Sequence, residues 1–491
     1  MKTVEQYLTS LRDRNIRLFM RGKRVENPVD HPLIAPSVRT IAESYRLAED
    51  PRYRSLVVAH SRFIDAEVNR FTHIFETQED LLKKIEMQRV LGRLTGTCFQ
   101  RCVGMDALSA LYNVTFEMDQ AGRAGVHARF GVHARFIEYL KRVQREDLVL
   151  CGAMTDPKGD RKKGPTEQPD MYLRVVGRTE TGIVVRGAKM HQTGVVNAHE
   201  IVVMPGRALG PGMEEFAVSF AVPVDTPGVT LVYGRQPSDD RRLGCDIDQG
   251  NARYGGQEAV VLFEDVEVPM ERVFMLGETQ FAGPLVEYFA GYHRQSYGGC
   301  KPGNGDVLIG AAALAAKLAG VEKAPHVRDK LVEMTHLNET MHGCGVACSV
   351  RCSPTPAGTM MVDPLLANVT KQNVTRFPYE MARLAEDIAG GLLVTMPSAE
   401  DLQSPEVGPL LQKYIAGARG SAEDRARVLR LIETMTLGAT AVAYRTESMH
   451  GAGSPQAQRV RIEAQAGLEE KMADASRIAG IAPGAPGGSE Q

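Results

Sequence analysis

The sequence lacks the features that define several classes of protein. No uninterrupted apolar run approaches the ~20 residues that a membrane-spanning helix needs. The N-terminal stretch MKTVEQYLTSLRDRN is charged and amphipathic, without the apolar core of a signal peptide. A formal net charge of -2 leaves no basic excess for nucleic acid or anionic lipid. We therefore expect a cytoplasmic protein with neither a nucleic-acid nor a membrane partner.

Cysteine is sparse, with 8 residues in a chain of 491. Such a content does not describe a disulfide scaffold, so the thiols are expected to be buried apolar groups, metal ligands or nucleophiles. The sequence also has no GxGxxG turn between a strand and a helix, so a Rossmann dinucleotide fold is not indicated. The apolar content of 43% and charged content of 24% are those of a globular protein, and the length predicts two or three domains.

The hydrophobic period changes twice along the chain. Residues 1–145 carry apolar residues at three- and four-residue spacing, as in ALSALYNVTFEMDQ, which predicts a helical domain. Residues 146–278 contain Val-rich segments interrupted by Gly and Pro, as in EAVVLFEDVEVP, which predicts a β domain. Helical spacing returns over 279–480, and the tail 481–491 is expected to be disordered. The predicted class is α+β, with the β domain between two helical domains.

One hexapeptide, GVHARF, occurs twice in tandem at 125–130 and 131–136. The two histidines, His127 and His133, are six residues apart and would lie on different faces of a helix. We interpret the repeat as a duplication in a loop or at a helix end and not as a metal site.

Two groups of cysteines have helical spacing. In CFQRC, Cys98 and Cys102 are four residues apart, which on a helix would point both sulfurs in one direction. Cys344, Cys348 and Cys352 also repeat at four residues, but the small residues between them are typical of close helix packing. We expect the second group to belong to the apolar core.

The segment GYHRQSYGGCK, residues 291–301, concentrates reactive side chains. His293 and Tyr297 would share a helix face, and the glycines 298–299 are expected to end the helix before Cys300. Such a segment could be a metal site, an acid–base site or an ordinary capped helix end. A lone histidine near a helix end most often caps it.

A ligand set of three cysteines and one histidine would form if His293 and Cys300 approached CFQRC. Residue type suits zinc and an iron–sulfur cluster equally well. The wide separation of the ligands in sequence slightly favours the cluster, because structural zinc sites are mostly more compact.

Two segments of the predicted β domain could contact a flat cofactor. The turn in MTDPKGDR, 154–161, would bring Lys158 and Arg161 near phosphates, although a surface turn is the commoner case. The segment MHQTG, 190–194, places the Thr193 hydroxyl at an expected strand end.

Seven motifs together resemble the 4-hydroxybutyryl-CoA dehydratase family, also called vinylacetyl-CoA Δ-isomerases: CFQRCVGMDA, AMTDPKGDR, GAKMHQTG, YGGQEAVVLF, AGYHRQSYGGCK, RFPYEMARLAEDIAGG and YRTESMHGAGSPQAQR. The resemblance covers almost the whole chain and is interrupted at the duplication, after Arg161 and in the tail. The wider superfamily includes flavin-dependent 4-hydroxyphenylacetate 3-monooxygenases, which implies an acyl-CoA-dehydrogenase-like fold.

The resemblance also implies cofactors, site residues and a homotetramer, a dimer of dimers. A 4Fe-4S cluster would be bound by Cys98, Cys102, His293 and Cys300. FAD would lie against the β domain, near a subunit boundary that 387–391 approaches, and would contact Met154, Thr155, Lys158, Asp160, Arg161, Thr193 and Gln100. The implied catalytic residues are His293, Glu447, Tyr297, Glu258 and Lys301.

The implied reaction is the radical dehydration of 4-hydroxybutyryl-CoA to crotonyl-CoA, with vinylacetyl-CoA Δ-isomerisation. Dehydration must remove a β-hydrogen that no carbonyl acidifies, and acid–base catalysis alone contributes only about 10²- to 10⁴-fold. In the implied route a base removes the α-proton and flavin takes one electron, which acidifies the β-hydrogen. The γ-hydroxyl then leaves with help from iron, and flavin returns its electron. His293 or Glu447 would act as bases, assisted by Tyr297 and Glu258.

Two other functions remain open from the sequence. A flavin-dependent phenol monooxygenase of the same fold would have no use for three cysteines and a histidine. A non-catalytic metal-binding or redox-sensing protein would leave Glu258, Glu447 and the MTDPKGDR segment without a purpose.

Overall fold

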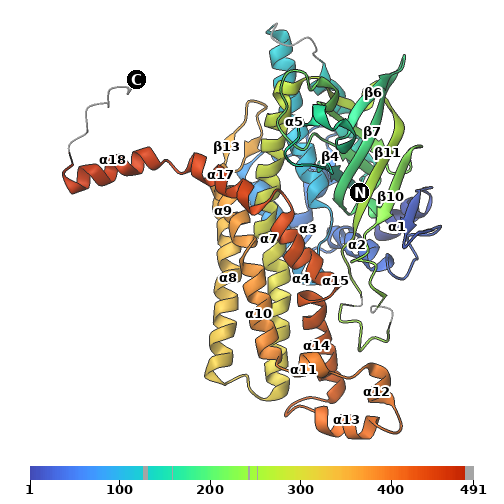
Figure 1. Ribbon diagram of the computed structural model, residues 1–491, viewed down its shortest axis with the longest axis vertical. Coiled ribbons are helices and arrows are strands. Elements are labelled where there is room, and N and C mark those ends of the chain that lie inside the picture. Colours follow the sequence, from blue (N-terminus) through green and yellow to red (C-terminus); the bar gives the residue numbers. More distant parts are fainter. Residues whose placement is uncertain (125–130, 158, 241–243, 252, 482–491) are drawn as a thin grey trace.

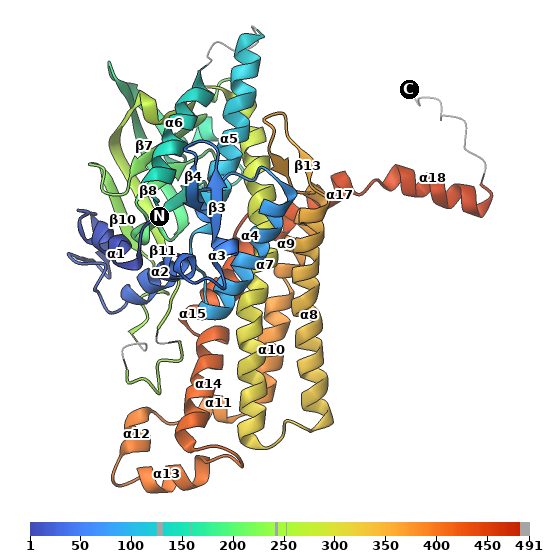
Figure 2. The ribbon, with the colours of Figure 1, turned by 180° about the vertical axis from the view of Figure 1, so that it is seen from behind.

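The computed structural model describes residues 1–124, 131–157, 159–240, 244–251 and 253–481. Two β-sheets lie at one end of the molecule, and long helices run from them to the other end (Figures 1 and 2). The observed mixture of sheets and helices confirms the predicted α+β class. Among the described residues, no helix combines the length and the apolarity needed to cross a membrane. The division into three domains at the predicted boundaries stays a prediction.

The strands form a six-stranded sheet in the order β2-β1-β10-β11-β7-β6 and a four-stranded sheet in the order β12-β9-β8-β5. Two further hairpins pair β3 with β4 and β13 with β14. The bounds of the strands are β1 Leu18–Met20, β2 Lys23–Arg24, β3 Val58–Ser61, β4 Ala66–Asn69, β5 Leu150–Ala153, β6 Arg174–Arg178, β7 Gly182–Thr193, β8 Glu200–Val203, β9 Val218–Pro223, β10 Val229–Tyr233, β11 Glu258–Pro269, β12 Val273–Leu276, β13 Ser353–Pro354 and β14 Met360–Met361.

The helices precede, cover and extend beyond the sheets. Their bounds are α1 Val4–Arg12, α2 Ala35–Glu49, α3 Arg54–Val57, α4 Gln78–Thr95, α5 Cys102–Arg123, α6 Val132–Arg145, α7 Thr279–Ala319, α8 Pro325–Val350, α9 Pro364–Val374, α10 Phe377–Ala389, α11 Leu392–Thr395, α12 Ala399–Gln403, α13 Gly408–Ile415, α14 Ala422–Thr436, α15 Ala439–Ala441, α16 Glu447–His450, α17 Pro455–Gln465 and α18 Leu468–Ala479. A π-helical turn, Val442–Thr446, lies between α15 and α16.

The two large sheets pack face to face around one apolar core. Phe220 of β9 and Phe263 of β11 meet there, with ring centroids 6.1 Å apart. Alternate residues of β8 point to opposite faces, so Ile201 enters the core between the sheets while Val202 packs against the core that includes α5 and α6. Because β8 is buried on both faces, the residues after Glu200 are three consecutive apolar side chains and not an alternation.

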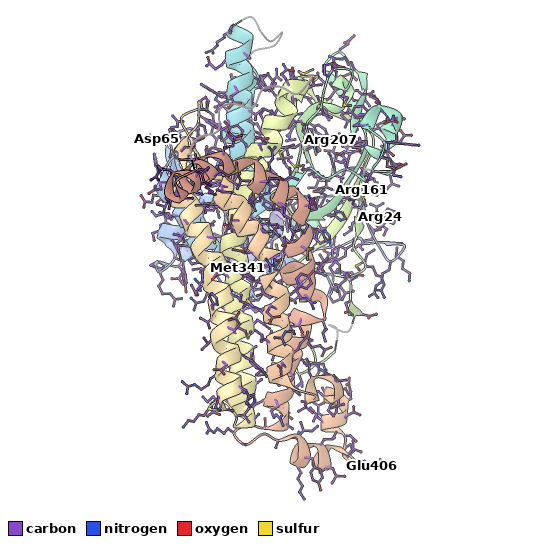
Figure 3. All side chains as sticks on the ribbon, turned by 60° about the vertical axis from the view of Figure 1, so that its left-hand side comes forward. Arg24, Asp65, Arg161, Arg207, Met341 and Glu406 are labelled. Atoms are coloured by element: carbon purple, nitrogen blue, oxygen red, sulfur yellow. The ribbon has the colours of Figure 1, made fainter. Side chains whose placement is uncertain are left out.

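Helices α7, α8, α10 and α14 form the bundle that extends away from the sheets (Figure 1). Met341 of α8 is fully buried inside this bundle, and Figure 3 shows it among the long helices. The predicted helical segments after residue 279 therefore pack their apolar faces on one another.

The glycines 298–299 do not end the helix before Cys300, as we expected from the sequence. Helix α7 continues from Thr279 to Ala319. A Cβ on Gly298 would lie 2.7 Å from the Cα of Gly345 in α8, and one on Gly299 would lie 2.6 Å from the carbonyl oxygen of Ile85 in α4. The glycines are thus needed for the close approach of neighbouring helices. Their lack of side chains serves packing here and not chain reversal.

Pro302, two residues after Cys300, is also accommodated inside α7. A proline has no N–H to donate, so the carbonyl of Gly298 loses its partner in the helix. His342 of α8 compensates, because its Nδ1 donates to that carbonyl oxygen at 3.2 Å.

The expectation that CFQRC lies on a helix is wrong. Helix α4 ends at Gly96, which has a left-handed φ of 62°, and α5 begins only at Cys102. Gln100, between the two cysteines, also has a positive φ of 65°. The motif is therefore a turn that leads into α5, and its four-residue spacing does not reflect a helical face.

Three sequence features remain to be located: the GVHARF repeat, the C-terminal tail and the second group of cysteines. The first GVHARF copy, with His127, lies outside the described residues, as do residues 482–491 of the predicted tail. The second copy begins at Gly131 and enters α6, where Asp119 accepts from the backbone N–H of Val132 at 2.9 Å. Of the three cysteines expected in the apolar core, Cys348 is completely buried there, whereas Cys344 and Cys352 are only partly buried.

The packing of α7 predicts opposite effects for two glycine substitutions in the same helix. At Gly303 a Cβ would lie 2.9 Å from the Cα of Gly92 and closer still to the carbonyl oxygen of Arg89, both backbone atoms of α4. We expect Gly303→Ala to lower stability by about 1–3 kcal/mol. At Gly310 nothing lies within 4 Å, so Gly310→Ala should raise stability by about 0.5–1 kcal/mol. Melting temperatures from circular dichroism test this; equal shifts for both variants would contradict it.

Candidate functional site

Helix α7 carries four of the predicted site residues on one side. His293, Tyr297, Cys300 and Lys301 are spaced at four, seven and eight residues, so they line one face of the helix. Their exposed fractions are 5%, 2%, 7% and 1%. His293 lies well inside α7, which excludes its interpretation as a cap at a helix end.

The turn CFQRC brings two further thiols to this face. Cys98, Cys102 and Cys300 are all buried and none is in a disulfide. Their charges would interact: Cys300 contributes to raising the pKa of both Cys98 and Cys102. The two segments, about two hundred residues apart in sequence, therefore lie near each other in the buried interior.

These thiols are not activated as nucleophiles. Burial raises the pKa of Cys98 and Cys102 well above the ordinary value, and Glu447 raises that of Cys98 further. Burial also raises the pKa of Cys300 to about 11, although the Lys301 ammonium opposes the rise. Such thiols stay protonated at neutral pH unless a metal replaces their protons.

The ligand spacing does not match a single metal ion. Within the described ranges, no three His, Cys, Asp or Glu side chains converge closely enough to hold one. A tetrahedral zinc site needs all its ligands in contact with one ion. A four-iron cluster instead takes one protein ligand per iron, so its ligands surround a larger body.

The His293 ring is fixed on several sides. Its Nδ1 lies 2.8 Å from the Oδ2 of Asp106, and it stacks on Phe289 with centroids 5.3 Å apart. The Tyr297 ring meets it edge-on at 5.4 Å. Asp106 in turn pairs with Lys84, whose Nζ lies 2.6 Å from its Oδ1. The ring orientation is therefore set by buried groups of α4, α5 and α7.

Sequence reasoning missed Asp106 and Lys84. Both are completely buried, and each is the partner that a buried charge requires. The available signal was a lysine on an apolar helix face: Lys84 shares its side of α4 with the buried Leu81 and Leu91.

Glu258 and Thr193 face each other where two neighbouring strands meet the site. Glu258 begins β11 and is in register with Thr193 at the end of β7. The Thr193 hydroxyl donates to the Glu258 carboxyl group, at 2.8 Å from Oε1. Burial, and then the nearby Glu447, raise the pKa of Glu258 well above its ordinary value. Glu258 is therefore held as a protonated acid at pH values where an exposed glutamate is ionised.

Glu447 is held by a buried lysine. Lys301 Nζ lies 3.1 Å from its Oε2 and also donates to the carbonyl oxygen of Ala443. Burial would lower the pKa of Lys301, but Glu447 and the thiols of Cys300 and Cys98 raise it above the ordinary value. The carbonyl that Lys301 binds belongs to the π-helical turn before Glu447, so the same lysine holds both the turn and the carboxylate.

A second buried lysine, which the sequence analysis did not identify, flanks Tyr297. Lys371 of α9 lies 4.7 Å from the Tyr297 ring centroid and donates to the carbonyl oxygen of Ser448. Burial, and then Lys301, lower the pKa of Lys371 to about 7. The Tyr297 hydroxyl is buried without a hydrogen-bond partner among the described residues. The sequence could have indicated this residue by its position, because Lys371 lies on the same helix face as the apolar Ala367 and Val374.

The predicted flavin-contacting residues divide into two groups. Met154 and Thr155 lie beside β7: the Met154 carbonyl accepts from Lys189 at 2.9 Å, and the Thr155 carbonyl accepts from Met190 N at 2.8 Å. Lys189 also pairs with Asp156 at 2.8 Å, which anchors the loop.

The remaining members of this set lie farther along the loop or are engaged elsewhere. Asp160 and Arg161 are exposed, and Figure 3 shows Arg161 on the strand-rich half of the molecule. Lys158 lies outside the described residues. The Gln100 amide donates to the backbone carbonyls of Ser37 and Gly255 and accepts from Asn197. A flavin contact for these residues stays a prediction.

The raised pKa of Glu258 predicts a pH-dependent loss of stability. The folded protein retains a proton that the unfolded chain releases above about 4.5, so this group's contribution to stability falls as pH rises through that window. Glu258→Gln removes the titration, and its melting temperature should fall less than that of the wild type from pH ~5 to pH ~8. Thr193→Val removes a donor to the carboxylate, which should raise the pKa of Glu258 further and extend the fall to higher pH. Equal slopes in all three proteins would contradict the assignment.

Known proteins match both the sequence and the fold. The models for the N-terminal and C-terminal parts of 4-hydroxyphenylacetate 3-hydroxylase match residues 3–275 and 282–480. The chain is 53% identical, over 98% of its length and 100% of the relative's, to a 4-hydroxybutyryl-CoA dehydratase/vinylacetyl-CoA Δ-isomerase of Clostridium aminobutyricum.

Solved structures give the same result. An oxygen-tolerant archaeal 4-hydroxybutyryl-CoA dehydratase from N. maritimus superposes with a TM-score of 0.95 and 51% identity, covering 100% of this chain and 97% of that one. The oxygenase component (HpaB) of 4-hydroxyphenylacetate 3-monooxygenase, complexed with FAD, shares the fold at a TM-score of 0.85 and 24% identity, covering 98% and 99%. These matches confirm the predicted acyl-CoA-dehydrogenase-like fold. The chain belongs to the 4-hydroxybutyryl-CoA dehydratase/vinylacetyl-CoA Δ-isomerase family, within the 4-hydroxyphenylacetate 3-hydroxylase superfamily.

Proposed function

We propose that this protein dehydrates 4-hydroxybutyryl-CoA to crotonyl-CoA and isomerises vinylacetyl-CoA, by a radical route that uses FAD and a 4Fe-4S cluster. The observation that carries the proposal is the meeting of three unpaired buried thiols, an oriented histidine and two differently held carboxyl groups at one site. The substrate class rests on the name of the relative that is 53% identical.

The donor set fits an iron–sulfur cluster. Cys98, Cys102 and Cys300 are buried with raised pKa values, so they would lose their protons at neutral pH only to a bound metal. His293 has Nδ1 occupied by Asp106, which leaves Nε2 for a metal. When bound, the cluster would supply a Lewis-acidic iron next to His293, which can assist the departure of a hydroxyl group.

The flavin contacts are proposed around the ends of β7 and the loop after β5. Met154, Thr155 and Thr193 would line this side, with Lys158, Asp160, Arg161 and Gln100 as further candidates. The buried pair Lys189–Asp156 holds the loop against β7. When bound, FAD supplies reversible one-electron transfer, which this chain's side chains cannot provide.

The two carboxyl groups divide the proton transfers. Glu447, paired with Lys301, is available to accept the α-proton, whereas Glu258 is held protonated and can donate. With Nδ1 against Asp106 and Nε2 directed to a bound cluster, His293 would have no nitrogen free for a proton, so we assign the base to Glu447. Tyr297 presents an unpartnered hydroxyl as a further donor. A phenol monooxygenase or a redox sensor would not need one carboxyl group as a base and another as an acid.

The assembly proposed is a homotetramer. Helix α18 extends away from the rest of the chain in both ribbon views, and none of its residues is buried (Figures 1 and 2). Leu468 and Met472 are one turn apart and expose 54% and 61% of their surface. An apolar face that its own chain does not cover suits packing against a partner subunit.

Removing this helix should weaken the assembly. We expect the full chain to sediment as a tetramer, and a chain that ends at Gly467 to sediment as a smaller species, because it loses the apolar face of α18. A full-length protein that sediments as a monomer and still holds one FAD per chain would contradict the tetramer.

The proposed function is tested with cysteine variants of anaerobically purified protein. Cys98→Ala should lose iron and crotonyl-CoA formation together, because a thiolate anchors the cluster. Cys348→Ala is the matched control: it also removes a buried thiol, yet it should keep its iron and its turnover. Iron analysis, the absorption spectrum and product chromatography give the readouts. Wild-type protein with flavin but no iron, or loss of iron only from the Cys348 variant, would contradict the proposal.

A further inference from the structure

Behind His293 lies a buried polar cluster formed by Lys84, Gln88, Asp106 and Ser296. The exposed fraction of each is at most 1%. The four side chains come from α4, α5 and α7, so the cluster connects three helices. None of them was among the residues implied by the sequence, and the proposed reaction does not use them.

The hydrogen bonds of the cluster run in one direction, toward Asp106. Gln88 Nε2 donates to Ser296 Oγ at 3.0 Å, and this hydroxyl donates to Asp106 Oδ2 at 3.0 Å, with the Tyr292 carbonyl oxygen as a second acceptor at 3.3 Å. Lys84 Nζ donates to Asp106 Oδ1 at 2.6 Å. Every neighbour that touches the carboxylate is therefore a donor, and a carboxylate can only accept.

Among the described residues, Asp106 is the one carboxylate that Lys84 hydrogen-bonds, and the lysine ammonium also lies 4.6 Å from the Phe75 ring centroid. Its remaining hydrogens go to the carbonyl oxygen of Tyr292 at 2.8 Å and to Gln295 Oε1 at 3.0 Å, both of them neutral. Asp106 is thus the counter-ion of a fully enclosed lysine, and it stays an acceptor.

This direction fixes the proton on the histidine ring. Nδ1 lies 2.8 Å from an oxygen that can only accept, so Nδ1 must carry hydrogen. In a neutral imidazole the other nitrogen then presents its lone pair. Ligating histidines commonly donate their second nitrogen to a carboxylate in this way, which fixes the ring and strengthens the ligand.

We propose that Asp106, paired with Lys84, is a positioning residue that holds His293 in the Nδ1–H tautomer and so presents Nε2 to the iron. The inference rests on the proposed function, because it requires His293 to be a ligand. The competing explanation is structural: the Lys84–Asp106 pair only holds α4, α5 and α7 together.

Asp106→Asn separates the two explanations. An amide offers one oxygen and one NH₂ to the three donors, and the charged Lys84 takes the oxygen. The NH₂ group then faces His293, whose Nδ1 must accept and whose proton moves to Nε2, as when an asparagine replaces the buried aspartate of a serine-protease triad. The ligand lone pair then points away from the iron. We expect iron loss to a chelator to accelerate by about 10-fold or more.

Ser296→Ala is the matched control. It removes another donor from the same carboxylate oxygen, yet leaves Asp106 to accept from His293. Its iron should leave at the wild-type rate, even if its melting temperature falls. Equal rates of iron loss from Asp106→Asn and the wild type, or equal acceleration in both variants, would overturn the proposal.

A second measurement needs no variant. Protein labelled with ¹⁵N at only one histidine nitrogen is reduced and studied by pulsed electron paramagnetic resonance. Strong coupling to the Nε2 label supports the proposal, and strong coupling to the Nδ1 label overturns it. Iron without any strong histidine coupling overturns the ligand assignment of His293, and this inference with it. The labelling thus separates failure of the tautomer from failure of the proposed ligand set.

Discussion

The close packing of α7 against α4 and α8 is the constraint on which the site depends. Gly298 and Gly299 bring the backbone of α7 into contact with Gly345 and with the carbonyl of Ile85. Only this approach allows the next residues, Cys300 and Lys301, to stay helical and to share a face with His293. A break at the glycines would send those two side chains elsewhere. The local rule that glycine ends helices gives way here because tertiary packing supplies the stabilisation.

Three buried lysines are stabilised by the same kind of contacts. Lys84, Lys189 and Lys301 each pair with one carboxylate and donate to at least one backbone carbonyl. Each pair joins segments that are distant in sequence, and breaking one would leave an uncompensated buried ion. Lys371 differs: among the described residues it hydrogen-bonds no carboxylate, and the pKa of its ammonium falls to about 7. Two lysines, Lys301 and Lys371, therefore flank the Tyr297 ring, and Lys371 gives up its proton more readily than an exposed lysine does.

The sequence predicted the α+β class, since strand and helix periods follow directly from which faces are buried. It did not predict strands β1 to β4 within residues 1–145, of which β1 and β2 belong to the six-stranded sheet. It also suggested that CFQRC and residues 293–300 lie close together, but only because their side chains together would make a set of three cysteines and one histidine. It failed at Gly298–Gly299 and at Gln100, where packing and a left-handed turn override local spacing. The roles of Asp106 and Lys371 could not be predicted, because a buried charge is recognised by its partner, and partners are set by the fold.

The central claim is that one buried site is built by two distant segments around a four-iron cluster. Anomalous diffraction at the iron absorption edge, from crystals grown without oxygen, tests this most directly. The account predicts strong iron density bounded by Cys98, Cys102, Cys300 and His293, with the His293 ring still directed at Asp106. Iron density beside Cys344, Cys348 and Cys352, or no iron in protein that forms crotonyl-CoA, would contradict it.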